Sequence, residues 1–290
     1  MSTGNYFTPL RYPGGKGKLA EYIKAIVLAN DLSGGIYVEP YAGGSAVALE
    51  LLQLDYVDEI HLNDLNRGVY AFWRSVLDYT DELVERIDQT AVTMDEWHRQ
   101  KLVQVNANSR VLDLGFATFF LNRCNRSGIL KAGVIGGKDQ KGTWKLDARF
   151  NKANLIKRIQ AIKQYRNRIV LHREDAVDLV RALSKKLPSN TLFYLDPPYY
   201  IKGQGLYDNF YEHEDHQAVS KAMRKISKSK WIVSYDDVPE IREMYSDFRS
   251  LRYRLSYSAQ RREQGGEIMF FCPDLEIPEI PDSVPMHVAA

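Results

Sequence analysis

The tetrapeptide Asp196-Pro197-Pro198-Tyr199 carries groups that could activate an aromatic amine. The lone pair of such an amine is delocalised into its ring, so the nitrogen becomes nucleophilic only when acceptors hold both of its hydrogens. The Asp196 carboxylate and the Pro197 carbonyl are two such acceptors, and the prolines fix the turn that aims them. Tyr199 adds an aromatic face on which a base can stack. The same residues would also suit a plain turn, with Asp capping a helix and Tyr in the core, so the tetrapeptide alone leaves both interpretations open.

A second candidate site is the glycine-containing turn at residues 38–45, Val-Glu-Pro-Tyr-Ala-Gly-Gly-Ser, which joins an apolar segment to a helical one. Paired glycines let a ligand approach the backbone closely. Asp64 follows Gly44 by 20 residues, the spacing at which an acid reaches the ribose of a nucleoside in doubly wound folds. The chain has no Gly-x-Gly-x-x-Gly sequence, so the turn indicates a nucleoside cofactor in general and not specifically a dinucleotide.

Residues 10–18, Leu-Arg-Tyr-Pro-Gly-Gly-Lys-Gly-Lys, have only a superficial similarity to a phosphate-binding loop. That loop requires a glycine five residues before the Gly-Lys pair and Ser or Thr after the lysine. Neither Gly15 nor Gly17 meets the spacing, and no Ser or Thr follows Lys16 or Lys18. The pattern therefore argues against a nucleoside triphosphatase.

Positive charge is concentrated in one segment of the chain. Residues 121–170 hold thirteen Lys or Arg and two acids, a local charge of +11 in a chain whose overall charge is +2. A charge run can simply be a solvated helical face. The nearly uniform sign, with Gly, Asn and aromatic residues interleaved, instead favours a surface that binds a polyanion such as nucleic acid.

Strand-like segments alternate with helical patterns along most of the chain. The expected strands are residues 36–39, 59–63, 169–172, 191–195 and 231–235, and the clearest helices between them are 45–54, 176–187 and 216–227. This alternation predicts an α/β fold with a mostly parallel, doubly wound sheet. Residues 250–257 and 267–271 predict a hairpin that ends the sheet with an antiparallel strand. In open sheets of this kind, ligands bind at the carboxyl ends of strands, where the tetrapeptide lies.

The alternation stops between residues 67 and 165, where the pattern is helical and a Gly- and Lys-rich loop follows at 133–142. We therefore expect a core formed by residues 1–66 and 166–273, interrupted by a helical, basic recognition domain at 67–165. The tail at 274–290 has three prolines, four acids and no Lys or Arg, which predicts disorder.

The remaining chemistry-bearing residues give weaker signals. Cys124 and Cys272 lie far apart in the sequence, so we expect neither a disulfide nor a cysteine-based zinc site. His213 and His216 could form a metal-binding pair, but they are better explained as residues at a helix start, and we expect no metal. The chain has no apolar run of about 18 residues and no signal-peptide pattern, so a cytoplasmic protein without a membrane partner is expected.

In combination, and in this order, the three segments resemble the Dam-like, D12-class N6-adenine DNA methyltransferases. The resemblance spans residues 9–271, nearly the whole chain. It implies a Rossmann-like methyltransferase core with a helical DNA-recognition insert. It also implies S-adenosylmethionine as the cofactor and double-stranded DNA as the substrate. Methylation would occur at the N6 amino group of an adenine flipped out of the duplex, by direct in-line displacement.

The family's motifs carry over to individual positions of this chain. The catalytic residues would be Asp196, Pro197 and Tyr199, with the face of the Tyr199 ring and not its hydroxyl contacting the base. The cofactor-binding residues would be Tyr12, Lys16, Glu39, Pro40, Tyr41, Gly43, Gly44, Asp64, Asp175 and Asp196. By the same resemblance, Asn122, Arg123, Arg126 and Ser127 would bind DNA, and the basic insert would add Lys138, Lys141 and Lys145.

Two points leave alternatives open. Many relatives have an aromatic-Asn-Gly where this chain reads Arg126-Ser127-Gly128, so the recognised DNA sequence does not transfer. The rival functions are methylation of RNA or of a protein glutamine amide, and a DNA-binding regulator without catalysis. The basic insert and the Asp-led tetrapeptide argue against the protein substrate, and the intact Asp196 argues against the regulator. We expect a monomer, or a weak dimer on DNA.

Overall fold

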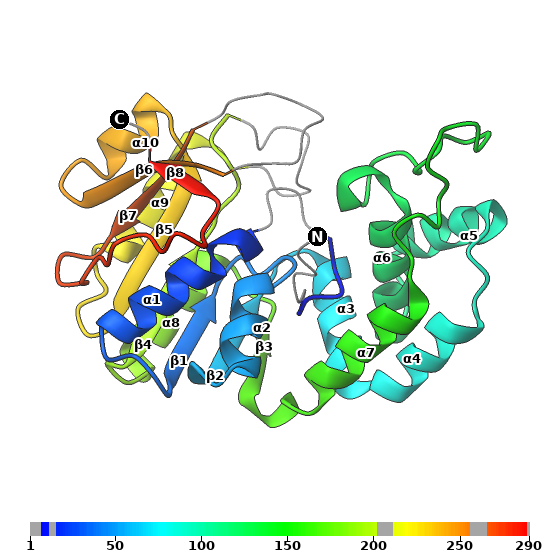
Figure 1. Cartoon of the computed structure of the whole chain (residues 1–290), viewed down its shortest axis with the longest axis horizontal. Helices are drawn as coiled ribbons and strands as arrows, with labels where there is room; N and C mark the ends of the chain where they lie inside the picture. Colours follow the sequence, from blue (N-terminus) through cyan, green and yellow to red (C-terminus); the bar gives the residue numbers. More distant parts are fainter. Residues whose placement is uncertain (1–6, 12–15, 202–210, 256–265, 289–290) are drawn as a thin grey trace.

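Eight strands form one sheet in the order β3-β2-β1-β4-β5-β7-β6-β8 (Figure 1). The computed structural model describes residues 7–11, 16–201, 211–255 and 266–288, and every structural statement refers to these. The strands are β1 (Gly35–Glu39), β2 (Val57–Asn63), β3 (Ile169–His172), β4 (Thr191–Leu195), β5 (Lys230–Asp236), β6 (Arg249–Leu255), β7 (Glu267–Phe271) and β8 (Met286–Val288).

Strands β1 to β5 all run parallel. The predicted α/β fold with a mostly parallel sheet is therefore confirmed, and each of the five expected parallel strands is present. The strand order reverses between β1 and β4, because the chain builds outward through β2 and β3 before it returns. A reversal of this kind leaves a crevice at the carboxyl ends of the two central strands, where ligands bind.

Helices cover both faces of this sheet. They are η1 (Lys16–Leu19), α1 (Ala20–Ala29), α2 (Ala46–Gln53), α8 (Ala176–Lys186), α9 (His213–Met223) and α10 (Pro239–Met244). α1 packs beside α2, and α8 packs beside α9. Because α2 and α9 connect strands in opposite directions along the sheet, right-handed crossovers place the two helix pairs on opposite faces. No helix within the described ranges is long and apolar enough to span a membrane.

The segment between β2 and β3 is helical, as the sequence predicted. It contains α3 (Arg67–Asp78), α4 (Thr80–Gln89), α5 (Met94–Val105), α6 (Val111–Cys124), η2 (Arg126–Gly128), α7 (Lys152–Lys163) and η3 (Arg166–Arg168). α6 packs against α3 and α5, α7 packs against α4, and the group lies beside the sheet (Figure 1). We propose that this group is the recognition domain.

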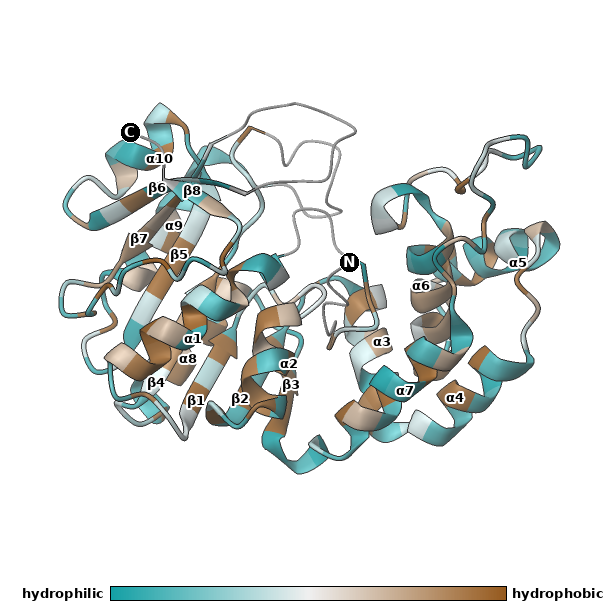
Figure 2. Cartoon of the chain, in the orientation of Figure 1, coloured by the Kyte–Doolittle hydropathy of each residue, from teal (hydrophilic) through white to brown (hydrophobic). Residues whose placement is uncertain are grey.

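Helix α7 shows why these helices pack together. Its buried residues Leu155, Ile159 and Ile162 have the spacing of one helical face, so burying them fixes which side of the helix meets its neighbours. Lys157, Arg158 and Gln160 lie between them in the sequence, so hydrophobic and hydrophilic residues alternate along the helix (Figure 2).

The far end of the sheet is antiparallel. β7 pairs with β5 on one side and with β6 on the other, so the predicted hairpin is confirmed over the described residues, while 256 and 257 lie outside them. The predicted disorder of the tail is wrong for 274–288, because β8 pairs with β6 and forms the outermost strand of the sheet. Val284 and Met286 are buried, and the carbonyl of Pro281 accepts a hydrogen bond from the Val284 amide. Here proline shapes a turn, and two apolar side chains outweigh the acidic composition.

The ordered tail leads to a stability prediction. Met286 is 7% exposed, and replacing a buried Met by Ala costs about 2 kcal/mol or more. Met286→Ala should therefore lower the free energy of unfolding by about 2 kcal/mol, measured by urea denaturation. Glu279 of the same tail is exposed, so Glu279→Ala should change that free energy by less than about 0.5 kcal/mol. Equal, small effects of both substitutions would show that β8 does not pack on the sheet.

Candidate functional site

The chemistry-bearing residues predicted from the sequence gather at the carboxyl edge of the sheet, where the parallel strands end. Glu39 ends β1, Asp64 follows β2, Asp175 precedes α8 after β3, and Asp196 follows β4. These strands are parallel neighbours, so their carboxyl ends lie side by side. Tyr12 was also expected here, but it lies outside the described residues.

The glycine turn after β1 is held by hydrogen bonds to its backbone. Gly43 adopts a positive φ of 46°, a conformation that glycine tolerates without strain. Its amide donates to Asp64 Oδ2 at 3.0 Å, and its carbonyl accepts from the indole of Trp73 at 2.9 Å. Asp64 Oδ1 accepts from the amide of Asn66 at 2.9 Å. Asp64 therefore fixes the backbone of the glycine turn and lies at the carboxyl edge of the sheet.

Glu39 is buried beneath the same turn. One of its carboxylate oxygens accepts a hydrogen bond from the amide of Ala48 in α2, at 3.2 Å. Burial raises the pKa of Glu39 to about 8, although the Ala48 amide and the Tyr37 hydroxyl oppose the increase. Glu39 thus joins the end of β1 to the first turn of α2, and it is 5% exposed.

Asn63 is a residue of this edge that the sequence analysis missed. Its side-chain amide donates to the Pro40 carbonyl at 2.9 Å and to the Glu174 carbonyl at 3.1 Å. Its carbonyl oxygen accepts from the Glu174 amide at 2.9 Å. Asn63 is almost fully buried and fastens the turn after β1 to the end of β3. The signal was present, since a polar residue ending an apolar strand needs partners when buried.

Asp175 and Tyr41 border the outer part of the edge. Asp175 caps α8, because its Oδ1 accepts hydrogen bonds from the amides of Val177 and Asp178 at 2.9 and 3.1 Å. Within the described residues, its Oδ2 takes no hydrogen bond. The hydroxyl of Tyr41 lies 3.1 Å from that of Tyr211, which connects the glycine turn to the segment before α9.

The two oxygens of Asp196 have different surroundings. Its Oδ1 accepts a hydrogen bond from the Ser234 hydroxyl at 2.9 Å and lies 3.3 Å from Lys16 Nζ. Oδ2 has no partner among the described residues, and the side chain is 26% exposed. Burial raises the pKa of Asp196, Lys16 opposes this, and Glu267 adds to it. The Pro197 carbonyl likewise has no hydrogen-bond partner in the described chain.

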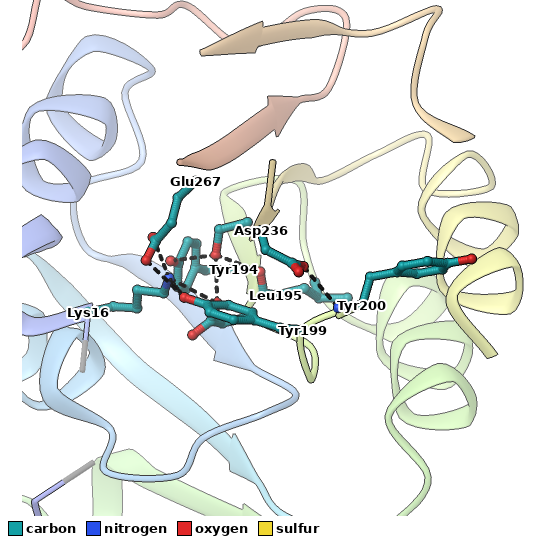
Figure 3. Close-up of polar contacts among 9 residues, drawn as sticks. Lys16, Tyr194, Leu195, Tyr199, Tyr200, Asp236 and Glu267 are labelled. Carbon is teal, nitrogen blue, oxygen red and sulfur yellow. Dashed lines mark hydrogen bonds and ion pairs between the residues drawn. The ribbon is translucent and has the colours of Figure 1, made fainter. Parts of the chain in front are cut away.

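Lys16 lies at the centre of a buried polar network (Figure 3). Its ammonium group donates to Glu267 Oε2 at 2.7 Å and to the Tyr199 hydroxyl at 3.0 Å, in addition to the ion pair with Asp196. Burial alone would lower the pKa of Lys16, but the surrounding acids and phenols hold it well above its usual value. Three ammonium hydrogens thus face three acceptors, and Lys16 stays charged.

Tyr199 is held by its hydroxyl, which the sequence analysis had treated as unimportant. The hydroxyl donates to Glu267 Oε1 at 2.9 Å and accepts from Lys16. Lys16 Nζ also lies 5.2 Å from the centre of the Tyr199 ring. The charged pair of Lys16 and Glu267 therefore sets the orientation of the Tyr199 ring.

A carboxylate of β5 fixes the chain just after the tetrapeptide. The two oxygens of Asp236 accept hydrogen bonds from the amides of Tyr200 and Ile201, at 2.9 and 3.0 Å (Figure 3). Asp236 is 5% exposed. It is a second residue that the sequence analysis missed, although an acid at the end of the strand next to β4 was a visible signal.

The predicted DNA-binding residues fall into two groups. Asn122 is corrected: it is 3% exposed, and its side chain bonds the Arg11 backbone and the Gly128 carbonyl. Its amide is thus already occupied in holding the loop. Arg123 is half-buried, and its guanidinium donates to the carbonyls of Arg149 and Pro9. Arg126 and Ser127 are exposed.

The loop between η2 and α7 presents its lysines to solvent. Lys138, Lys141 and Lys145 are exposed, and so is Trp144, at 65%. Gln140 ties the loop together, because its side chain donates to the carbonyls of Ile135 and Gly137 and accepts from the Leu146 amide. The sequence analysis noted aromatic residues among the basic ones without naming Trp144, which the structure places beside the exposed lysines of this loop.

The histidines noted in the sequence have protein partners. His213 lies 3.0 Å from the Tyr200 hydroxyl, and the fully buried His216 lies 3.3 Å from the Tyr235 hydroxyl. No group of three His, Cys, Asp or Glu side chains suited to a metal occurs within the described ranges.

Comparison with known proteins identifies a family and several similar chains. A family model described as D12 class N6 adenine-specific DNA methyltransferase matches residues 12–259. The Type II methyltransferase M.MjaIII of Methanocaldococcus jannaschii is 24% identical over 204 residues, covering 66% of this chain and 68% of that protein.

Two solved structures are also similar, at levels that carry no argument about function. The rRNA methyltransferase AviRa of Streptomyces viridochromogenes has a TM-score of 0.40 and 11% identity, covering 90% of this chain and 85% of its own. Protein LPL1258 of Legionella pneumophila has a TM-score of 0.29 and 16% identity, with 89% and 86% covered.

The buried Glu39 leads to a prediction about pH. Its pKa rises from 4.5 to about 8 on folding, so between these values folding takes up a proton at Glu39. The parent should therefore lose stability as pH rises through this window, by about 1.4 kcal/mol per pH unit from this group, and no further above about pH 8. Glu39→Gln stays neutral and should lack this dependence.

Denaturant unfolding from pH 5 to pH 9 measures the effect. The free energy of unfolding of Glu39→Gln, relative to the parent, should increase with pH and then level off. Exposed Glu82 provides the control, because Glu82→Gln should give a curve parallel to that of the parent. A difference between Glu39→Gln and parent that stays constant with pH would show that Glu39 is ionised in the folded chain.

Proposed function

The chain belongs to the D12 class N6 adenine-specific DNA methyltransferase family, and on this basis we propose how it acts. We propose that it transfers a methyl group from S-adenosylmethionine to the N6 amino group of an adenine flipped out of duplex DNA. One observation carries this proposal. Asp196 Oδ1 is anchored by Ser234 and Lys16, whereas Oδ2 and the adjacent Pro197 carbonyl have no partner in the described chain.

Two unpartnered acceptors beside a crevice are what an aromatic amine needs. Asp196 Oδ2 would accept one amino hydrogen and the Pro197 carbonyl the other, which draws the nitrogen lone pair out of conjugation with the ring. Both acceptors are already in place, so little reorganisation is needed at the moment of reaction. The nitrogen exchanges one hydrogen for the methyl group, and Asp196 Oδ2 is positioned to receive that proton and release it to solvent.

The donor set fits a cationic nucleoside cofactor. Asp64, Asp175, Asp196 and Glu267 place four acids along the described edge besides Glu39, whose raised pKa keeps it largely neutral near pH 7. The ammonium group of Lys16 lies among them. The oxygens of Asp64 accept hydrogen bonds from the amides of Gly43 and Asn66. These bonds hold the carboxylate at the end of β2, where an acid in a doubly wound fold reaches the ribose of a nucleoside. Asp175 Oδ2 is open to an adenine amino group. When bound, S-adenosylmethionine would supply a methyl group carried on a positively charged sulfur.

Base flipping follows from the depth of the acceptors. An intact duplex cannot bring an amino group into a crevice beside a buried network, whereas one extruded nucleotide can. Extrusion costs a few kcal/mol, and stacking on an aromatic ring returns about 1–3 kcal/mol per base. Tyr199 would provide that ring, with its hydroxyl fixed by Lys16 and Glu267.

The loop at residues 133–145 is the surface we propose for duplex DNA. It presents Lys138, Lys141, Lys145 and the exposed Trp144, on a backbone held by Gln140. At the base of this loop, burial and the charges of three further arginines lower the pKa of Arg123 to about 9. Crowded positive charge is relieved by a phosphate, so a DNA backbone is a suitable partner for this surface.

Removing the free acceptor tests the catalytic proposal. Asp196→Ala should abolish adenine methylation, with a loss of at least about 10³-fold, while the fold and most of the cofactor affinity persist. Single-turnover transfer of labelled methyl groups to DNA measures the first effect, and calorimetry with S-adenosylhomocysteine the second. Asp178→Ala, which replaces an exposed acid on α8, is the control. Near-parent turnover in Asp196→Ala would contradict the assigned role.

The salt dependence of DNA binding tests the proposed surface. Each phosphate contact should contribute about −0.9 to the slope of log K against log salt. Replacing Lys138, Lys141 and Lys145 by Ala should therefore make that slope less steep by about 2 to 3, without changing cofactor affinity.

A control variant removes the same charge elsewhere. Lys185, Lys186 and Lys228 are exposed near the C-terminal end of α8 and the start of β5, at the edge of the sheet opposite the site. Replacing them by Ala should leave the slope within about 0.5 of the parent value. If the two triple variants give the same slope, the DNA surface lies elsewhere.

A further inference from the structure

Glu267 has no role in the sequence analysis, yet it makes two of the short contacts in the site. We propose that Glu267 is a positioning residue for methyl transfer, which fixes Lys16 and Tyr199 and thereby keeps one oxygen of Asp196 available to the substrate amine. This inference rests on the proposed function of Asp196. It identifies Glu267 as the residue on which the geometry of Asp196 depends.

The position of Glu267 follows from the antiparallel end of the sheet. β7 runs opposite to β5, and Glu267 pairs with Asp236 in the register of the two strands. The first residue of β7 therefore lies at the carboxyl edge of β5, beside the tetrapeptide. Its side chain is 6% exposed and points to Lys16 and Tyr199 (Figure 3). An acid opening an otherwise apolar strand is unexpected unless it has charged partners.

Glu267 closes a ring of three hydrogen bonds. Lys16 donates to Glu267 Oε2 and to the Tyr199 hydroxyl, and the Tyr199 hydroxyl donates to Glu267 Oε1. Each carboxylate oxygen thus holds one partner, so Glu267 sets the place of the ammonium group and the orientation of the phenol together. Glutamine could not match both bonds with equal strength, because its amide nitrogen is a donor.

The ammonium group of Lys16 is shared between the carboxylates of Glu267 and Asp196. Lys16 Nζ lies 2.7 Å from Glu267 Oε2 but 3.3 Å from Asp196 Oδ1. Without the charge of Glu267, the ammonium group would be drawn fully to Asp196. It would then compete with the substrate amine for the carboxylate on which catalysis depends.

Besides Glu267, the titratable groups that interact with Asp196 are Lys16 of η1, Tyr37 and Glu39 of β1, and Tyr194 of β4. Tyr199 of the tetrapeptide and Tyr253 of β6 act on Lys16. Glu267 raises the pKa of Asp196, in the same direction as burial. Neutralising Glu267 should therefore lower that pKa, both directly and by letting Lys16 approach Asp196.

Two variants distinguish the effect of the charge of Glu267 from the effect of its side-chain length. Glu267→Gln keeps the size and removes the charge, so kcat should fall by about tenfold. The acidic limb of the pH–rate profile should move to lower pH, by about half a unit or more. Glu267→Asp keeps the charge but is one methylene shorter, so kcat should fall while the acidic limb stays where it is in the parent. Loss of packing alone would not move the limb in one variant and leave it in the other.

A second readout does not require turnover. The side-chain carboxyl of Asp196 can be followed by ¹³C NMR during a pH titration, with its resonance assigned by its loss in Asp196→Asn. Its pKa should be lower in Glu267→Gln than in the parent and unchanged in Glu267→Asp. If the parent does not methylate DNA, the proposed function fails, and the titration still decides the inference about Glu267.

The outcomes divide cleanly. A lowered Asp196 pKa in Glu267→Gln, with reduced kcat in both variants, supports the positioning role. An unchanged or raised pKa in a folded Glu267→Gln, or parent-like kcat in either variant, overturns it. If Glu267→Gln does not fold, as judged by circular dichroism, then Glu267→Asp decides: reduced kcat with an unmoved limb supports the role, and parent-like kcat overturns it.

Discussion

A single buried ammonium group organises the site. Lys16 is shared by Glu267 and by two groups of the tetrapeptide, Asp196 and the Tyr199 hydroxyl, so the network joins three separate parts of the chain. An unpaired charge in this position would cost several kcal/mol, whereas three well-placed acceptors compensate for the lost hydration. The arrangement fixes the position of the tetrapeptide, and it engages only the Oδ1 oxygen of Asp196. The remaining oxygen is the chemical resource that an amine methyltransferase requires.

The sheet explains why these groups meet. The strand order reverses between β1 and β4, so the glycine turn and the tetrapeptide border one crevice. Antiparallel β7 then brings the beginning of a strand, and with it Glu267, to an edge otherwise built from strand ends. Asn63 and Asp236 secure the neighbouring turns through backbone hydrogen bonds. The helices inserted between β2 and β3 pack beside the sheet (Figure 1).

Local signals made the parallel strands, the hairpin and the tetrapeptide predictable, because apolar segments and turn residues depend on nearby sequence. The partners of those residues were not predictable. Lys16 and Glu267 are 251 residues apart, and nothing in their surroundings indicates that they pair. Asn122 was misassigned to DNA because its burial depends on Arg11 and Gly128, which the chain brings to it only when folded. The order of the tail was not predicted because its acidic, proline-containing composition gives no sign that Val284 and Met286 become buried when β8 pairs with β6.

A structure of the protein with duplex DNA and a non-reactive analogue of S-adenosylmethionine would test the central claim most directly. It should show the target adenine outside the helix, with its amino nitrogen about 3 Å from both Asp196 Oδ2 and the Pro197 carbonyl. Asp196 Oδ1 should still be bonded to Ser234. A target adenine that remains paired in the duplex, or an Asp196 Oδ2 bonded to Lys16 while the amine binds elsewhere, would contradict the account.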